Sequence, residues 1–511
     1  MVRIGDRVRV DDHLAVVRYI GNVDGYGDQI WLGLEWKDPK RGRHDGCVKG
    51  RRYFQTRHPT GGSLTKIENV QLPCDLLAEI KSRYIESDDG VQDQIDLAQT
   101  TKKIELVGMR KTATQQANIE KLVNIVLDNR SVGEAPPNDA PMFRQCKELN
   151  LYANLVYKWH TVKHMLKFFP KIQELNLRRN WMIDIDEDRE LVMEEQTFGV
   201  APFSETCTKL ILSECDMKAS SNIDAVLRRF PACVELVAFG NELAEFGLDA
   251  AQAARLTCLD LQGNPLRSLS AIKGIYANVR CLNVAKCEIR RIGDFSEAFP
   301  NLEFLNLREN LIAEWNSVNS LQKLNKLKNL LIDHRNFKLA PGINAFEVFI
   351  AKLPNLMDFN RFDVSEVERR SAEIRFLNNY FGIKDEELRN EHLHDIQRLV
   401  KIYGEPTVDA TTKGLKVVKL RIEYGNRVET RNLPLAMNVQ KVKDMAKKKQ
   451  QILRFQLSRL FKIGNSQDIA IYLVMCENHK QHRIELDNPL RELGHYSPSE
   501  ERDILVIEHK S

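Results

Sequence analysis

Residues 256–266 read LTCLDLQGNPL and residues 302–312 read LEFLNLRENLI, and both follow the pattern LxxLxLxxNxL. Nine segments of the chain follow the pattern LxxLxLxx(N/C)xL, two of them with Arg at its ninth position. The ninth positions are Arg130, Asn154, Asn180, Cys215, Asn241, Asn264, Cys287, Asn310 and Arg335. Consecutive ninth positions are 23 to 26 residues apart, except for an interval of 35 between Asn180 and Cys215. A repeat of this length predicts one short strand and one turn per unit.

This period and pattern are typical of leucine-rich repeats. The leucines at the fourth and sixth positions alternate inward from the strand, and the Asn or Cys side chain is expected to bond the backbone where the chain turns. Each unit can bury its apolar edge only by stacking on its neighbours. We therefore expect a curved solenoid over residues 102–380, closed by a charged helical cap around SEVERRSAEIRFLNNYFG.

Side chains at the outward strand positions would line the concave face of this solenoid. Aromatic and basic residues there suit contact with another protein, although outward residues are often only solvated. The candidates are Tyr152, Arg178, Arg179, Phe239, Asp260, Phe304 and Arg308.

The repeat pattern also accounts for most cysteines as core or turn residues and not as catalytic groups. These are Cys146, Cys207, Cys215, Cys233 and Cys287. Cys258 and Cys281 take the same outward position in adjacent repeats and are expected to be reduced thiols. The long interval carries an acidic insertion, residues 184–195, which we expect to be a solvated loop or a contact for a basic partner.

The composition excludes several classes of function. The 511 residues are 43% hydrophobic and 29% charged, with a net charge of +4, so no global attraction to nucleic acid or membrane follows. No stretch approaches ~18 consecutive apolar residues, and no signal peptide is expected at the N-terminus. No CxxC pair, phosphate loop or nucleophile elbow is found, and no paired HxxxH metal ligands are expected. His44, His58, His160 and His164 have no convincing Cys or Ser partner. We therefore expect no enzyme, no cofactor, no metal site, no membrane or nucleic-acid partner, and a reducing compartment.

Residues 1–70 alternate short β-type runs with glycine turns, and residues 42–54 read GRHDGCVKGRRYF. A phosphate loop would lead into a helix and carry a Ser or Thr, and this stretch does neither. Between Lys37 and Arg57 there are eight basic and two acidic residues, a local excess of six positive charges among aromatic rings. That arrangement suits single-stranded nucleic acid or an acidic peptide, and electrostatics alone does not separate the two.

The motifs GDRVRVDD, IWLGLEW, GRHDGCVKGRRYF and HPTGGSLTK resemble a CAP-Gly domain, whose signature is GKNDG followed by a glycine and a Tyr-Phe pair. The resemblance implies a small β-fold that binds the acidic, aromatic-ended C-terminal tails of α-tubulin and of certain microtubule-associated proteins. It maps the tail-binding groove onto Trp31, Gly42, Arg43, His44, Asp45, Gly46, Phe54, Leu64 and Lys66. Arg43 stands in place of Lys, His44 in place of Asn, and Leu64 where many members have Phe. Tyr53 and Trp36 are expected in the core.

The last segment has the pattern of a hairpin, a helix with Val439, Val442 and Met445 on one face, and later strands, and it resembles a ubiquitin-like β-grasp domain. The expected architecture is therefore multidomain, with α/β and β parts. It comprises a CAP-Gly domain (1–70), a helical, polar linker (71–101), the repeats with their cap (102–380), a second linker (381–414) and the ubiquitin-like domain (415–511).

This order of domains resembles the tubulin-folding cofactors. The resemblance implies a cytoplasmic, cytoskeleton-associated chaperone that binds α-tubulin, including its acidic tail. It also implies joint action with cofactors B, D and C in assembling the αβ-tubulin heterodimer and in taking it apart. The alternative is a CAP-Gly adaptor of microtubules without folding activity. Such adaptors usually carry long heptad coiled coils, and none is found here.

Overall fold

The computed structural model describes residues 2–85, 119–406, 417–424, 427–443, 445, 469–477, 480–486, 492–496, 498 and 503–509. The chain divides into two compact units, residues 1–312 with 323–333, and residues 313–322 with 334–511. None of the helices in the described residues has both the length and the hydropathy needed to cross a bilayer.

The first unit begins with a small antiparallel sheet in the order β1-β2-β3-β6. Its strands are β1 (Arg7–Val10), β2 (His13–Gly21), β3 (Trp31–Trp36) and β6 (Gly62–Lys66), and a short hairpin adds β4 (Cys47–Val48) and β5 (Arg51–Arg52). The core holds alternating residues of these strands, including Val8, Val17, Leu34 and Trp36. Trp36 is thus a core residue, as expected, and its Nε1 donates to Ser63 Oγ at 2.9 Å.

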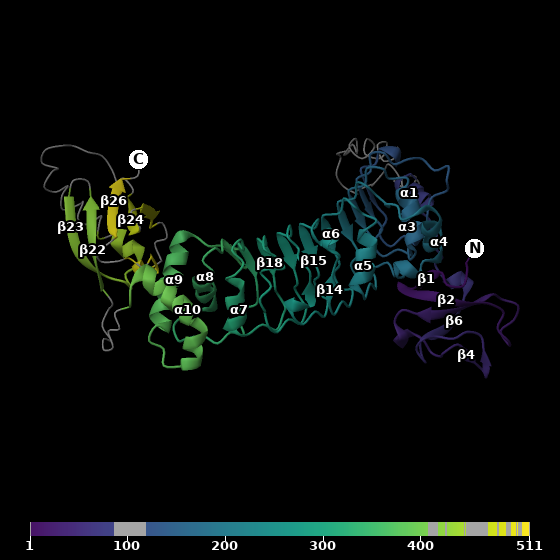
Figure 1. The fold of residues 1–511 in the computed structure, drawn as a ribbon, viewed down its shortest axis with the longest axis horizontal. Helices are drawn as coiled ribbons and strands as arrows, with labels where there is room; N and C mark the ends of the chain where they lie inside the picture. Colours follow the sequence, from purple (N-terminus) through teal and green to yellow (C-terminus); the bar gives the residue numbers. More distant parts are fainter. Residues whose placement is uncertain are drawn as a thin grey trace, which may run out of the picture. The chain divides into compact units, whose positions relative to one another are not determined.

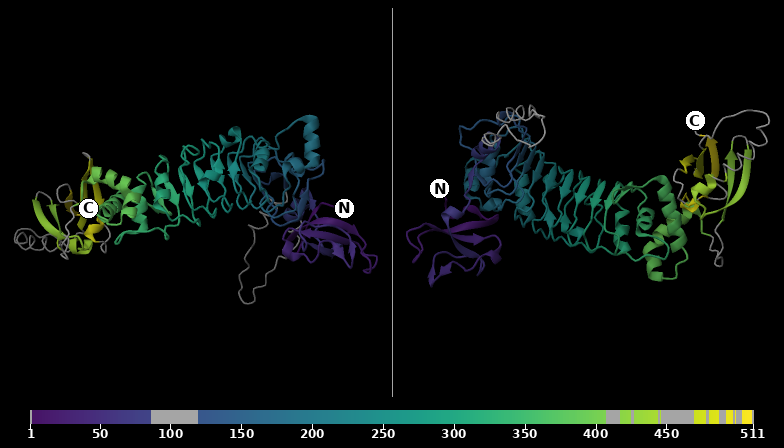
Figure 2. Two further views of the ribbon diagram at one scale, coloured as in Figure 1. Left: turned by 60° about the horizontal axis from the view of Figure 1, so that its bottom comes forward. Right: turned by 180° about the vertical axis from the view of Figure 1, so that it is seen from behind.

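The rest of this unit is a parallel sheet with one three-residue strand per repeat, and Figure 1 shows these strands side by side in chain order. The views in Figure 2 show the same stack from two further sides. The strands are β8 (Asn124–Val126), β10 (Glu148–Asn150), β11 (Glu174–Asn176), β12 (Lys209–Ile211), β13 (Glu235–Val237), β15 (Cys258–Asp260), β17 (Cys281–Asn283), β18 (Phe304–Asn306) and β19 (Asn329–Leu331).

Helices occupy the return part of several repeats, and additional short strands lie in others. The helices are α3 (Trp159–Leu166), α4 (Arg189–Phe198), α5 (Ser220–Leu227) and α6 (Ala250–Ala253), and β14 (Phe246–Gly247) pairs with β16 (Ile272–Lys273). Residues 74–84, expected as linker, contain β7 (Cys74–Asp75), which pairs with β9 (Val132–Glu134), and α1 (Leu76–Tyr84). The remainder of the predicted 71–101 linker lies largely outside the described residues.

The ninth-position side chains behave as the repeat pattern predicts. Asn241 is fully buried, its Oδ1 accepts from the backbone N–H groups of Cys215 and Met217, and its Nδ2 donates to the carbonyl of Leu212 at 2.8 Å. Cys215 occupies the same position one repeat earlier, and its thiol donates to Leu177 O at 3.1 Å. These bonds connect each turn to the previous repeat, so the ladder of Asn and Cys holds the stack together.

The second unit contains α7 (Trp315–Leu321), α8 (Ala345–Lys352), the hairpin β20 (Asp358–Phe359) and β21 (Phe362–Asp363), α9 (Glu366–Tyr380) and α10 (Glu386–Tyr403). Helix α9 is the predicted cap, and it begins with a capping box formed by Ser365 and Glu368. Helix α10 fills most of residues 381–414, which were expected as a linker, and packs against α9. That part of the segment is therefore folded structure.

The C-terminal sheet has the order β23-β22-β26-β24-β25 with β22 parallel to β26, which is the β-grasp topology. Its strands are β22 (Val417–Tyr424), β23 (Arg427–Pro434), β24 (Ile469–Glu477), β25 (Lys480–Glu485) and β26 (Ile504–His509). Val439 and Val442 are buried in its core and Met445 packs against it, as the helical face predicted. The ubiquitin-like fold is confirmed.

Candidate functional site

One face of the first sheet gathers several of the predicted tail-binding residues. Strands β3 and β6 pair Trp31 with Lys66 and Gly33 with Leu64. Because residues two apart on a strand share a face, Trp31, Leu64 and Lys66 lie on the same side of this pair of strands. Gly62, at the other end of β6, forms an isolated bridge with His44, so the glycine loop lies at the edge of that same face.

The backbone of the loop is held closely against β6. Gly62 O accepts from the N–H groups of Arg43 at 2.7 Å and His44 at 3.2 Å, and Gly62 N donates back to His44 O at 2.7 Å. A Cβ atom on Gly42 would lie 2.0 Å from Thr60 O, which no side chain could tolerate. Gly42 is therefore required by close approach of the backbone.

His44 is oriented by the loop itself. Gly46 N donates to His44 Nδ1 at 3.0 Å, so the neutral ring carries its proton on Nε2. Burial lowers the pKa of His44 below its usual value, against a smaller opposing effect of Asp45. The ring thus offers one hydrogen-bond donor, where the Asn of the family signature offers two.

Two predicted groove residues stabilise the loop from within. Asp45 Oδ1 accepts from Cys47 N at 3.1 Å and its Oδ2 accepts from Arg52 at 2.7 Å, and the bond from Arg52 is the main cause that lowers the pKa of Asp45. Phe54 is only 6% exposed, and a Cβ on Gly33 would lie 2.5 Å from its ring. Phe54 therefore supports the groove from within and is poorly placed to touch a ligand, whereas the Asp45 side chain stays partly exposed while it holds the loop.

The charges of the basic segment are partly neutralised by neighbouring carboxylates. Arg41 pairs with Asp11, Arg51 with Asp24 and Arg52 with Asp45. Arg43 is exposed and has no ion pair within the described residues. It is therefore available to an acidic ligand.

Trp31 stands half-buried at the start of β3, and the ring of Tyr26 meets it edge-on at 5.4 Å between centroids. Lys49 Nζ lies 4.5 Å from the centre of the Tyr26 ring, so positive charge is close to this aromatic pair. The Nε1 atom of Trp31 is shielded from solvent and has no hydrogen-bond partner in the described part of the chain. A buried donor without a partner fits a position that bonds a ligand.

The contact between the first sheet and the repeats was not predicted from the sequence. Arg9 is 3% exposed, and its guanidinium donates to Asn129 Oδ1 and to Ala153 O. Arg7 lies 4.4 Å from the centre of the Trp181 ring, and burial lowers its pKa to about 10. A cavity of about 540 Å³ lies beside this contact, and its walls combine residues of both parts, including Arg9, Lys37, Arg41, Asn129, Arg179 and Glu214.

The predicted concave residues fall into separate places on the sheet. Tyr152, Arg178 and Phe239 occupy one row, two residues beyond the strands, and the Arg178 guanidinium lies 5.6 Å from the Tyr152 ring and 5.3 Å from the Phe239 ring. Arg178 and Arg179 both pair with Glu214. Phe304 lies in another row, beside Cys281, and Arg308 lies in the row of Arg178 but five repeats farther along the sheet. Arg179 joins this group, since it also donates to Tyr152 OH at 2.8 Å, so the structure brings together Tyr152, Arg178, Arg179 and Phe239.

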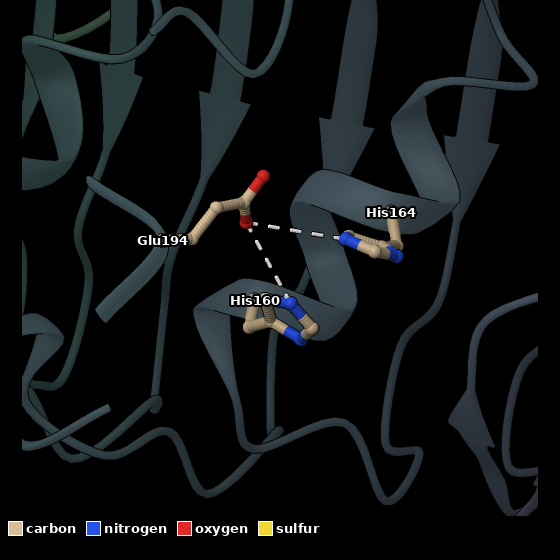
Figure 3. Close-up of side chains that lie close together, drawn as sticks. All are labelled: His160, His164 and Glu194. Atoms are coloured by element: carbon tan, nitrogen blue, oxygen red, sulfur yellow. Dashed lines mark ion pairs between the residues drawn. The ribbon is translucent and has the colours of Figure 1, made fainter. Parts of the chain in front are cut away.

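The acidic insertion is not the solvated loop that the sequence suggested, because it forms α4 and packs against α3. Its carboxylates find basic partners within the chain, since Glu190 pairs with Lys158, Glu194 with Lys163 and Glu195 with Arg229. Figure 3 shows Glu194 facing His160 and His164 of α3. The sequence prediction excluded paired HxxxH metal ligands, although residues 160–164 read HTVKH, and a spacing of four places both histidines on one helix face.

Known proteins resemble this chain both in its first domain and over its whole length. Residues 4–70 match the family model of the CAP-Gly domain. The chain is 28% identical to tubulin-specific chaperone E of Mus musculus, over 99% of this chain and 98% of that protein. From end to end, the chain resembles tubulin-specific chaperone E. The protein of that name from Drosophila melanogaster is 26% identical over 98% of this chain and 97% of its own length. Among solved structures, the ubiquitin-like domain of mouse tubulin-specific chaperone E matches 20% of this chain and 95% of its own, at 26% identity and a TM-score of 0.14.

Proposed function

We propose that this protein is a tubulin-folding cofactor that binds α-tubulin and acts in the assembly and dissociation of the αβ-tubulin heterodimer. The observation that carries the proposal is similarity to tubulin-specific chaperone E over 99% of the chain, across all three folded parts. Cofactors B, D and C are its expected partners, and the cytoplasm, in association with the cytoskeleton, is its expected location.

In this proposal the CAP-Gly groove holds the acidic C-terminal tail of α-tubulin. Arg43 meets a tail carboxylate, Trp31 and Leu64 contact the terminal aromatic ring, and Lys66 adds positive charge at the other end of the face. The unpaired, exposed state of Arg43 and the partnerless indole N–H of Trp31 support these roles. Attraction between exposed charges is screened by ions, so binding of the tail should weaken as salt is raised.

The repeat face would bind the folded body of tubulin. The row of Tyr152, Arg178 and Phe239 is ordered by contacts among its own side chains, so little side-chain freedom is lost when it meets a partner. Two tethered weak sites bind one object more tightly than either does alone. Dissociation of the heterodimer then needs no chemical step, because a chaperone that prefers one tubulin geometry shifts the equilibrium toward it.

The test is capture of α-tubulin, with and without its last residues, by the full-length chain. Removing a charge-assisted hydrogen bond costs about 1.5–3 kcal/mol, so Arg43→Ala should weaken binding of the intact tail by about 10- to 100-fold. Arg51→Ala is the matched control, because Arg51 lies in the same basic segment but pairs with Asp24. Equal capture of tubulin with and without its tail would remove the groove from the mechanism.

A second experiment separates a folding cofactor from a microtubule adaptor. The purified chain is mixed with αβ-heterodimer, and the release of free subunits is followed by size-exclusion chromatography. A folding cofactor shifts this equilibrium, whereas an adaptor that only tethers the tail binds the heterodimer and leaves it intact.

A further inference from the structure

The repeat that interrupts the regular spacing brings three potential metal ligands together. His160 and His164 lie one turn apart on α3, and their ring centroids are 4.2 Å apart. Glu194, on α4, places its Oε2 atom 3.6 Å from His160 Nε2 and 4.0 Å from His164 Nε2 (Figure 3). One ligand atom from each residue falls within 4.8 Å of the other two.

We propose that His160, His164 and Glu194 bind a divalent first-row transition ion, with Zn²⁺ as the favoured occupant. Two imidazoles and one carboxylate are an established ligand set for zinc. A tetrahedral ion with bonds of about 2.0–2.1 Å holds its ligand atoms roughly 3.4 Å apart. The separations of 3.6 and 4.0 Å from Glu194 therefore need only a small inward adjustment of the side chains. The fourth position would hold water or a donor from a bound partner.

A second carboxylate, that of Glu190, favours the tautomer of His160 that can bind a metal ion. Glu190 Oε2 lies 3.3 Å from His160 Nδ1, on the ring nitrogen opposite the proposed site. A proton held on Nδ1 by this carboxylate leaves Nε2 as a lone-pair donor toward Glu194. Carboxylate–histidine–metal arrangements of this kind are the common outer shell of zinc sites.

The surroundings of Glu194 leave its Oε2 atom free to coordinate an ion. Lys163 Nζ bonds to Oε1 at 3.1 Å, so it occupies the oxygen that faces away from the proposed ion. The Oε2 atom is shielded from solvent and accepts no hydrogen bond within the described residues. A buried carboxylate oxygen without a donor is costly, and coordination of a cation removes that cost.

Two neighbouring ammonium groups repel a cation here: Lys163 stays on Glu194 Oε1, whereas Lys167 must move. Lys167 Nζ lies 3.4 Å from His164 Nε2, but Lys167 is exposed at the end of α3 and its side chain can turn into solvent. Coordination would hold α4 against α3 and so fix the insertion against the preceding repeat.

The test is a titration of the metal-stripped, reduced full-length chain with Co²⁺ and then Zn²⁺. Tetrahedral Co²⁺ absorbs strongly in the visible range, and thiolate ligation adds charge-transfer bands, so a site on cysteine is distinguished from this one. We expect one Co²⁺ per chain, no thiolate band, and displacement by Zn²⁺. Glu194→Gln and His160→Gln should each abolish the visible band.

Two further variants make the assignment specific. Glu190→Gln should lower affinity about 10- to 100-fold, as loss of an outer-shell partner does. The matched control is His394→Gln, because His394 is exposed on α10, and it should bind as the wild type does. Circular dichroism of each variant confirms folding, and Glu194→Gln keeps the size of the side chain. Absence of the band in the wild type, or its survival in Glu194→Gln, would overturn the proposal.

Discussion

Replacing Lys352 with Met should lower the free energy of unfolding by about 3 kcal/mol, because it breaks a buried ion pair. The side chain of Lys352, at the end of α8, is 0% exposed, and its Nζ lies 2.7 Å from Asp395 Oδ2, 3.0 Å from His392 Nδ1 and 3.2 Å from Glu391 O. Removal of one partner of a buried pair typically costs about 3–5 kcal/mol, since the other charge stays desolvated. Asp395 keeps the amide of Gln322, at 2.9 Å, and the guanidinium of Arg398, at 3.5 Å, so the lower end of that range applies.

The assay is urea unfolding of the full chain, followed by circular dichroism. Lys401→Met is the matched control, because Lys401 lies exposed on α10, and its effect should stay within about 0.5 kcal/mol. The double variant Lys352→Met with Asp395→Leu should recover most of the loss, since no unpaired charge is left buried. A single variant within about 1 kcal/mol of the wild type, or a double variant less stable than the single one, would refute this reasoning.

Three further outcomes follow from the structure. Burial, and then Lys352, lower the pKa of His392 to about 2, so below the unfolded pKa of about 6.5 only the unfolded chain gains that proton. The free energy of unfolding should therefore fall by about 2 kcal/mol between pH 7.5 and 5. Urea titrations at each pH should show that His392→Gln removes this contribution. Asn241→Ala should cost at least about 3 kcal/mol in urea unfolding because it leaves several buried backbone groups unpaired, and Asn241→Cys should cost less, since the thiol of Cys215 already bonds a carbonyl in this ladder. His44→Asn restores a second donor and should tighten binding of a labelled acidic tail peptide about 10-fold in fluorescence anisotropy; unchanged affinity would show that this side chain does not contact the tail.

The repeats could be predicted in detail because their signal recurs. Each unit repeats the same alternation of leucines and the same Asn or Cys, so single exceptions such as Arg130 do not obscure the pattern. The β-grasp and CAP-Gly parts were predicted from motif spacing, and the core positions of Val439, Val442 and Trp36 agree with that prediction. The pairing of β3 with β6 brings Trp31, Leu64 and Lys66 to one face. That this face binds a ligand stays a prediction.

The acidic insertion shows where reading along the sequence is insufficient. A run of carboxylates looks solvated when its partners are distant in sequence. The partners of Glu190, Glu194 and Glu195 are 30 to 34 residues away. The same holds for Arg9, whose bonds to Asn129 and Ala153 span 120 and 144 residues. No local pattern marks such pairs.

The amino-acid sequence by itself determined the identity and order of the folded parts, because short-range periodicity and turn chemistry act within a few residues. It also determined the Asn and Cys ladder, which repeats at a nearly constant interval. Only the tertiary structure decided which charges are neutralised, which predicted groove residues are buried, and which histidines share a carboxylate. Those outcomes depend on distances between segments far apart in the chain, and burial changes the free energy of a charge far more than its neighbours in sequence do.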